Sequence, residues 1–138
     1  MLAVHKGVAH PWLCDVMGHM TTRYYVGMFD DASYHLLYAI FGWSAESVTE
    51  SGMGWADVRH VIEYQEEVAA GDILEVRGGI TKLGTKSATF YYEMFNLSQQ
   101  KIAATLESTS VYFDTRARKA VAITDEMRAL AQDHLIPD

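Results

Sequence analysis

Apolar and polar residues follow one another along this chain with spacings that predict one long helix among several strands. Residues 24–41 are mostly apolar over a length typical of a helix, so the helix that they form must be buried. Later segments are rich in β-branched and aromatic residues, as strands are. These segments are 58–68, 73–83, 87–97 and 102–113, and a first strand is expected at about 3–10.

The ends of the elements carry their own signals. Thr21 or Thr22 can cap the start of the long helix, and Gly42 is a natural left-handed C-cap. A polar connection rich in Ser, Glu and Gly then leads to the strands, whose short breaks predict antiparallel neighbours. These breaks fall at 70–72, 84–85 and 98–100. A final short helix is expected from a cap at Thr124 or Asp125 through His134.

One strand, one apolar helix and then a run of strands is an α+β pattern in which a sheet wraps around the helix. Residues 90–95 place apolar side chains on both faces of their strand, which is more than one helix requires and indicates an oligomer. A cone-shaped α+β barrel of the cystatin-like kind also curls its sheet over a helix and stays open as an alternative. The length suits a single domain, 1–138.

Composition and charge exclude several classes of protein. The formal net charge is −7 and no basic stripe interrupts it, which argues against a nucleic-acid partner. The N-terminus lacks the long apolar region of a signal peptide, and polar residues interrupt the helix at 24–41, so no membrane span is expected. The single cysteine, Cys14, excludes an internal disulfide and fits a cytoplasmic protein.

The turn before the long helix carries the candidate chemistry. Asp15 and His19 flank Gly18, and the helix starts shortly afterwards. The first amides of a helix have no acceptor within it and lie at the positive end of its dipole. They can therefore face a developing oxyanion while Asp15 faces the attacked carbon, which is a layout suited to acyl transfer.

Plainer roles exist for the same residues. Asp15 can simply accept hydrogen bonds from amides of its own turn, and His19 can tie that turn together. Cys14 with His19 as base would make a cysteine hydrolase. Alternation along an extended segment instead turns Cys14 towards the core when Asp15 faces the cleft.

Two blocks of the sequence resemble a known family. Asp15, Gly18 and His19, followed by 20–25 and 29–32, resemble the D-x-x-G-H-[VM]-N-N-x-x-Y…F-E-x-A signature of hotdog-fold enzymes of the 4-hydroxybenzoyl-CoA thioesterase type. A second block matches the family's second strand and following turn. It consists of Tyr64, Glu67, Gly71, Asp72, Leu74 and Val76. The chain departs from the family signature at the asparagine pair, where it has Thr21 and Thr22.

The resemblance implies a hotdog fold, in which an antiparallel sheet of about five strands wraps around one long central helix. It also implies hydrolysis of an acyl-CoA thioester, with Asp15 as nucleophile or general base. The backbone amide of Thr22 would be the oxyanion donor, and His19 would support the site. In this family the cleft lies between two subunits, so a homodimer or homotetramer is expected.

Substrate-binding residues are predicted from charge and aromatic character. Arg116 and Arg118 follow the last strand and Lys86 follows a turn, where each can hold phosphates of coenzyme A. Trp55 can line an acyl pocket. Residues of these kinds are also common as solvated charges and core aromatics.

No cofactor and no metal is expected, because the six histidines show no ligand spacing. His35, in the middle of the predicted helix, is read as a core histidine. Coenzyme A enters only as part of the substrate, whose acyl group the sequence does not specify. The alternatives are a hydratase or dehydratase acting on acyl thioesters and a non-catalytic acyl-CoA sensor.

Overall fold

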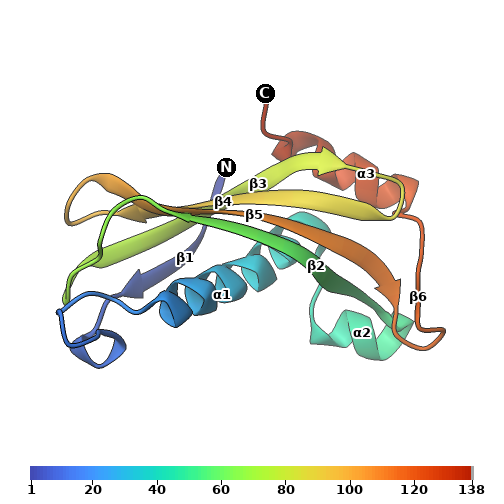
Figure 1. The fold of residues 1–138 in the computed structure, drawn as a ribbon. Coiled ribbons are helices and arrows are strands. Elements are labelled where there is room, and N and C mark those ends of the chain that lie inside the picture. The colour runs from blue at the N-terminus through green and yellow to red at the C-terminus, as the bar shows by residue number, and fades with distance from the viewer. Residues whose placement is uncertain (138) are drawn as a thin grey trace.

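A six-stranded sheet curls around one long helix in the computed structural model, which describes residues 1–137 (Figure 1). The strands are β1 (Leu2–Val8), β2 (Met53–Tyr64), β3 (Ile73–Leu83), β4 (Ser87–Asn96), β5 (Lys101–Asp114) and β6 (Lys119–Ala120). The helices are α1 (Thr22–Phe41), α2 (Ala45–Ser51) and α3 (Asp125–Ala131), with short 3-10 turns at Pro11–Leu13 and Gln132–His134. The α+β hotdog prediction is confirmed.

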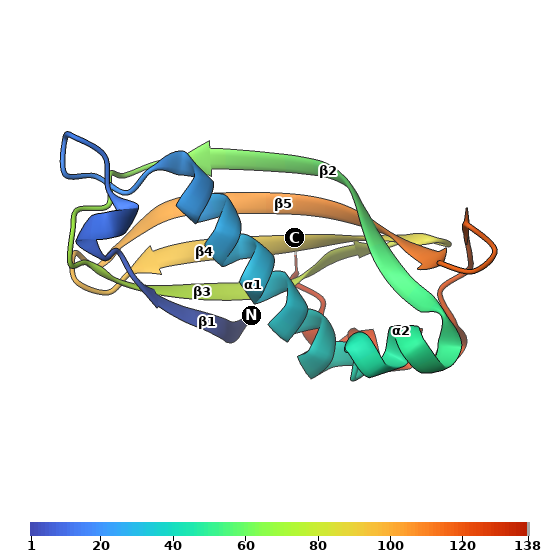
Figure 2. The ribbon, with the colours of Figure 1, turned by 90° about the horizontal axis from the view of Figure 1, so that it is seen from below.

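The strand order is β1-β3-β4-β5-β2, and neighbouring strands are antiparallel (Figure 2). The two hairpins that join β3, β4 and β5 confirm the prediction from their short breaks. The prediction fails between β2 and β3, because β2 pairs with β5 at the far edge of the sheet. Residues 65–72 cross the end of the sheet instead. Extended residues span about 3.3 Å each, so this segment can cross three strand spacings of about 4.8 Å.

Helix α1 is buried on one face only. Its buried residues recur at helical spacing and pack against the sheet; they are Tyr25, Met28, Phe29, Ala32, Leu36, Leu37 and Ile40. His35 lies on the opposite, exposed face, so its interpretation as a core histidine is wrong. Gly42 ends the helix with φ 67°, as predicted.

The N-terminus of α1 has no side-chain cap. Thr21 takes the N-cap position, but its hydroxyl makes no capping hydrogen bond, and its Oγ1 is buried without a partner in the described chain. The predicted capping by Thr21 or Thr22 is therefore wrong. The first amides of the helix are left without a side-chain acceptor at this end.

The polar connection after Gly42 contains a helix that its composition did not predict. In α2 the Ser44 side chain accepts from the backbone of Ser47, and the Ser47 hydroxyl accepts from the Ser44 amide. This reciprocal capping stabilises a short helix made of poor helix formers. Helix α3 starts as predicted, because the Thr124 hydroxyl accepts from the Met127 amide at 3.1 Å.

The sheet is apolar on both faces, as the sequence of β4 indicated. Phe90, Tyr92 and Met94 are buried, and Tyr91 and Phe95 are half-buried on the opposite face. The end of the chain covers part of that opposite face, where Ile136 packs over Gly79. None of the described helices is long and apolar enough to cross a membrane.

Candidate active site

A tight turn holds Asp15 beside the N-terminus of α1. The Asp15 amide donates to the His19 carbonyl at 2.9 Å, and the Gly18 amide donates to the Asp15 carbonyl at 3.0 Å. Gly18 has φ 79°, a conformation that favours glycine. The Asp15 carboxylate accepts through Oδ1 from the amides of Met17, at 2.8 Å, and His19, at 3.3 Å. Asp15 therefore does accept hydrogen bonds from amides of its own turn, as in the plainer role. These hydrogen bonds also fix the orientation of its carboxylate.

His19 contacts a glutamate that the sequence analysis did not select. Its Nε2 lies 3.2 Å from Oε2 of Glu67, which belongs to the segment that crosses the end of the sheet. The Met20 amide donates to the Val68 carbonyl at 2.8 Å, and this bond holds the crossing segment against the turn. Glu67 stands in the second block of the family resemblance, which is the signal that points to it.

A groove of about 290 Å³ runs beside this pair. Its lining residues come from the turn, from the start of α1 and from the crossing segment; they are Met17, His19, Met20, Thr22, Tyr25, Tyr64, Gln65, Glu66 and Glu67. Thr22 is the first residue of α1, so its amide has no acceptor within the helix. Asp15 is joined to the groove through the His19 amide. The three predicted catalytic residues thus lie at one end of the subunit.

Two tyrosines form the apolar side of the groove. The rings of Tyr25 and Tyr64 meet edge to face with centroids 5.1 Å apart. Burial raises the pKa of Tyr25, and a hydrogen bond with the backbone of Val68 offsets part of that rise. Tyr25 therefore stays a neutral phenol at physiological pH.

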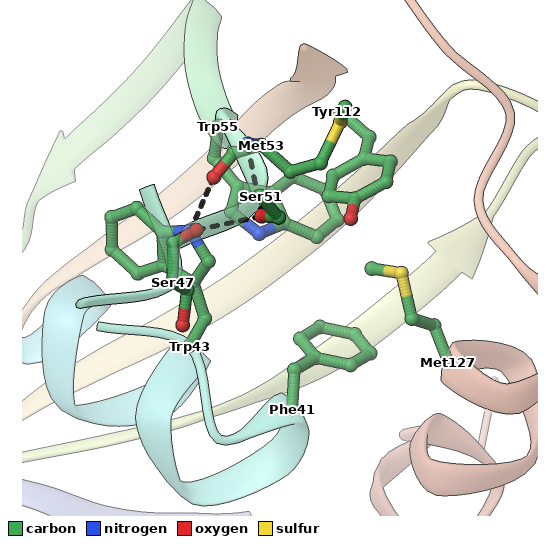
Figure 3. A pocket seen from close by; sticks show the side chains of 8 residues that line it. All are labelled: Phe41, Trp43, Ser47, Ser51, Met53, Trp55, Tyr112 and Met127. Carbon is green, nitrogen blue, oxygen red and sulfur yellow. Dashed lines mark hydrogen bonds between the residues drawn. The ribbon is translucent and has the colours of Figure 1, made fainter. Parts of the chain in front are cut away.

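A second cavity, of about 150 Å³, lies at the opposite end of α1 (Figure 3). Its lining is mostly aromatic and sulfur-containing, with three hydroxyls; the residues are Phe41, Trp43, Ser47, Ser51, Met53, Trp55, Tyr112 and Met127. Trp55 is at its centre, because its ring stacks on Phe41 at 5.6 Å and meets Tyr112 at 5.2 Å between centroids.

The predicted substrate-binding residues gather at this second end. Trp55 lines the cavity, and the Arg116 guanidinium donates to the Thr49 carbonyl at 3.0 Å, at the end of α2. Arg118 lies over the Phe113 ring, 5.1 Å from its centroid. Lys86 is exposed. Arg116 is thus engaged by the fold, while Arg118 and Lys86 stay exposed.

The two predicted sets do not meet within one subunit. Asp15, His19 and Thr22 lie where α1 begins, and Trp55 lines the cavity with Phe41, the last residue of α1. A helix of 20 residues is about 30 Å long. A substrate in contact with both sets in the same subunit would have to span that distance.

The two remaining candidates from the sequence are a metal site and a reactive Cys14. Among residues 1–137, no three His, Cys, Asp or Glu side chains gather as a metal site. Cys14 is half-buried rather than core, and its thiol donates to the His10 carbonyl at 3.5 Å. Its predicted burial is therefore wrong.

Fold and site together define a hotdog protein with a carboxylate turn at the head of its central helix. The profile of the thioesterase-like superfamily matches residues 9–130, and the chain belongs to this family. The predicted family is confirmed.

One known protein is similar to this chain in sequence over most of the chain's length. The chain is 27% identical over 131 residues to an L-carnitine dehydrogenase/betainyl-CoA thioesterase from Rhizobium sp, with 92% of this chain and 26% of the relative covered. It therefore spans about a quarter of that relative's length.

Solved structures share the fold. SAV2348 from Staphylococcus aureus, in complex with CoA, matches with TM-score 0.86 at 17% identity, covering 97% of this chain and 85% of that one. A member of the thioesterase superfamily from Jannaschia sp. CCS1 matches with TM-score 0.85 at 21% identity, covering 96% and 92%. BH1999 gentisyl-coenzyme A thioesterase matches with TM-score 0.78 at 17% identity, covering 91% and 97%.

Proposed function

We propose that this chain hydrolyses an acyl-CoA thioester to a free acid and coenzyme A in the groove at the start of α1. The observation that carries the proposal is the turn that fixes the orientation of the Asp15 carboxylate just before the uncapped start of α1. Membership of the thioesterase-like superfamily supports it. Coenzyme A belongs to the substrate, and the reaction requires no cofactor.

The chemistry follows from the two oxygens of Asp15. Oδ1 is held by the amides of Met17 and His19, whereas Oδ2 has no hydrogen bond within residues 1–137. Oδ2 can attack the thioester carbon, so that the C–S bond breaks, coenzyme A leaves as the thiol and water then hydrolyses the mixed anhydride. Alternatively, Oδ2 can take a proton from water, whose oxygen attacks the same carbon and displaces coenzyme A. The amide of Thr22 stabilises the oxyanion, and His19, held by Glu67, supports the turn.

The separation of the two predicted sets is resolved by a shared site. In the proposed dimer, the turn of one subunit works against the aromatic end of its partner. Trp55 then contacts the acyl group, and Arg118 with Lys86 meets the phosphates of coenzyme A. Arg116, whose guanidinium holds α2, helps to shape this end.

The test measures thiol release from a panel of acyl-CoA substrates that includes betainyl-CoA, the substrate in the curated relative's name. Asp15→Asn should lower kcat by about 10²-fold or more, because it removes the nucleophile or base. The folded state should persist, since the asparagine oxygen can still accept from Met17 and His19. Cys14→Ala, which changes the neighbouring residue, should keep its activity.

Each alternative gives a different result in the same panel. An acyl-CoA sensor would bind substrates without releasing thiol. A hydratase would change the absorbance of an enoyl-CoA without releasing thiol. Parent-like turnover by a folded Asp15→Asn variant would refute the role of Asp15.

A further inference from the structure

We infer that the aromatic cavity between α1, α2, β2, β5 and α3 binds a compact, uncharged apolar group that carries a hydrogen-bond acceptor oxygen. The inference rests on the proposed function, because this group would be the acyl end of the substrate. It names the chemistry of that acyl end, which neither the family nor the groove at Asp15 specifies.

Size and lining define the first part of the ligand. The cavity measures about 150 Å³, and a protein cavity of roughly this volume holds one benzene-sized molecule. Figure 3 shows the rings of Phe41, Trp55 and Tyr112 and the side chain of Met127 around the same space. These walls suit one ring or a short branched chain.

Charge defines the second part. Among residues 1–137, the lining contains no carboxylate and no cationic side chain. Aromatic faces attract cations, but one face of Trp55 is covered by Phe41, whose ring plane lies 24° from its own. Because the described lining has no carboxylate, a trimethylammonium group would have only contacts with the remaining aromatic faces to offset its desolvation.

An unused hydrogen-bond donor defines the third part. Trp55 Nε1 is buried and has no acceptor in the described chain. Three other polar groups of the cavity wall have partners. Trp43 Nε1 donates to the Met53 carbonyl at 3.1 Å, the Ser51 hydroxyl donates to the Ser47 carbonyl at 2.6 Å, and the Ser47 hydroxyl accepts from the Ser44 amide at 3.1 Å. A buried N–H without a partner is costly, and a ligand oxygen removes that cost.

Three small probes separate these properties. Cyclohexanone has the size and an acceptor oxygen, methylcyclohexane has the size alone, and tetramethylammonium has charge without an acceptor. Binding is followed by ¹H–¹⁵N NMR of the indole groups, because Trp55 reports directly on its own N–H. Trp12 lies close to the Asp15 turn, at the opposite end of the folded subunit. Its side chain is 73% exposed, and it serves as the internal control.

Cyclohexanone should bind about 10-fold more tightly than methylcyclohexane and should move the Trp55 indole resonance downfield, with Trp12 unchanged. Tetramethylammonium should bind weakest. Trp55→Phe should bring the two neutral probes within about 2-fold of each other, whereas Trp12→Phe should keep the parent ratio. Matching circular dichroism of parent and variant shows that the variant is folded.

Equal binding of the two neutral probes, tightest binding of tetramethylammonium, or an unmoved Trp55 resonance in the parent would each overturn the inference. These readouts need no catalysis, so they stand apart from the proposed function. If the probes bind as expected but no acyl-CoA releases thiol, the cavity holds and the thioesterase proposal fails. If thiol is released and the probes do not bind as expected, the acyl group lies elsewhere.

Discussion

At the scale of single residues, the contact between His19 and Glu67 is the least expected feature of the site. The Glu67 side chain is 78% exposed, so a pair of this kind contributes at most about 1 kcal/mol to stability. The contact with Glu67 instead orients the His19 imidazole, because it fixes the ring against the turn that carries Asp15. Glu67 is therefore a positioning residue in the proposed reaction.

A double-mutant cycle tests this role. Glu67→Ala and His19→Ala should each lower kcat by about 10-fold with little change in KM, and the double variant should be no worse than the poorer single one, because both remove the same contact. Glu67→Gln keeps an acceptor for Nε2 and should restore most of the rate. Glu63→Ala, at an exposed carboxylate of β2 that does not line the groove, is the matched control and should turn over normally.

Fully additive losses in that cycle would show that the two side chains act independently. A loss in Glu63→Ala as large as that in Glu67→Ala would point to a general effect of removing an acidic side chain instead. Denaturation curves for all variants separate these kinetic effects from unfolding.

At the scale of elements, one glycine sets how closely the sheet approaches α1. A Cβ on Gly78 in β3 would lie 2.7 Å from Cδ1 of Tyr92 and 3.2 Å from Cδ2 of Leu36. Tyr92 is fully buried and cannot move aside without disturbing the core. The close packing of sheet and helix therefore depends on the missing side chain.

Gly78→Ala should destabilise the protein by about 1–3 kcal/mol through overpacking. Gly27→Ala is the matched control, since a Cβ there meets nothing within 4 Å on the exposed face of α1. Because alanine favours the helix, this control should stabilise the fold by about 0.5–1 kcal/mol. Urea unfolding midpoints measure both changes, and equal midpoints for the two variants would contradict the packing argument.

At the scale of the whole molecule, β2 leaves one edge of the sheet without a neighbour. The strand bulges between Asp57 and Arg59, and Val58 at the bulge is 62% exposed. Apolar side chains are also exposed in the Asp15 turn, where Trp12 is 73% and Met17 70% accessible. Long free edges and apolar patches of this kind are typical of surfaces that a second copy covers.

We therefore expect Val58→Asp to convert an oligomer into a folded monomer that has lost thioesterase activity, although no proposed catalytic residue is changed. Light scattering gives the mass, circular dichroism the fold and thiol release the rate. Leu130→Asp introduces the same charge at a side chain that is 46% exposed on α3, and it should leave mass and rate unchanged. A folded monomer that keeps the parent rate would disprove the shared site.

Local signals in the sequence determined much of this protein. Helical periodicity placed α1, Gly42 ended it with the expected left-handed conformation, and Thr124 capped α3 as predicted. The short breaks gave the pairing of β3, β4 and β5. The Asp15 turn was visible because each of its residues acts on near neighbours in the chain.

Only the tertiary structure decided the rest. Backbone hydrogen bonds between strands carry no residue code, so the sequence did not reveal that β2 pairs with β5. That pairing sends the following segment across the sheet and brings Glu67 to His19. The order of the strands also forms the cavity around Trp55, because the walls of this cavity come from separate elements. Alternation determines which face of an element is buried, whereas the order of the strands determines which distant side chains meet.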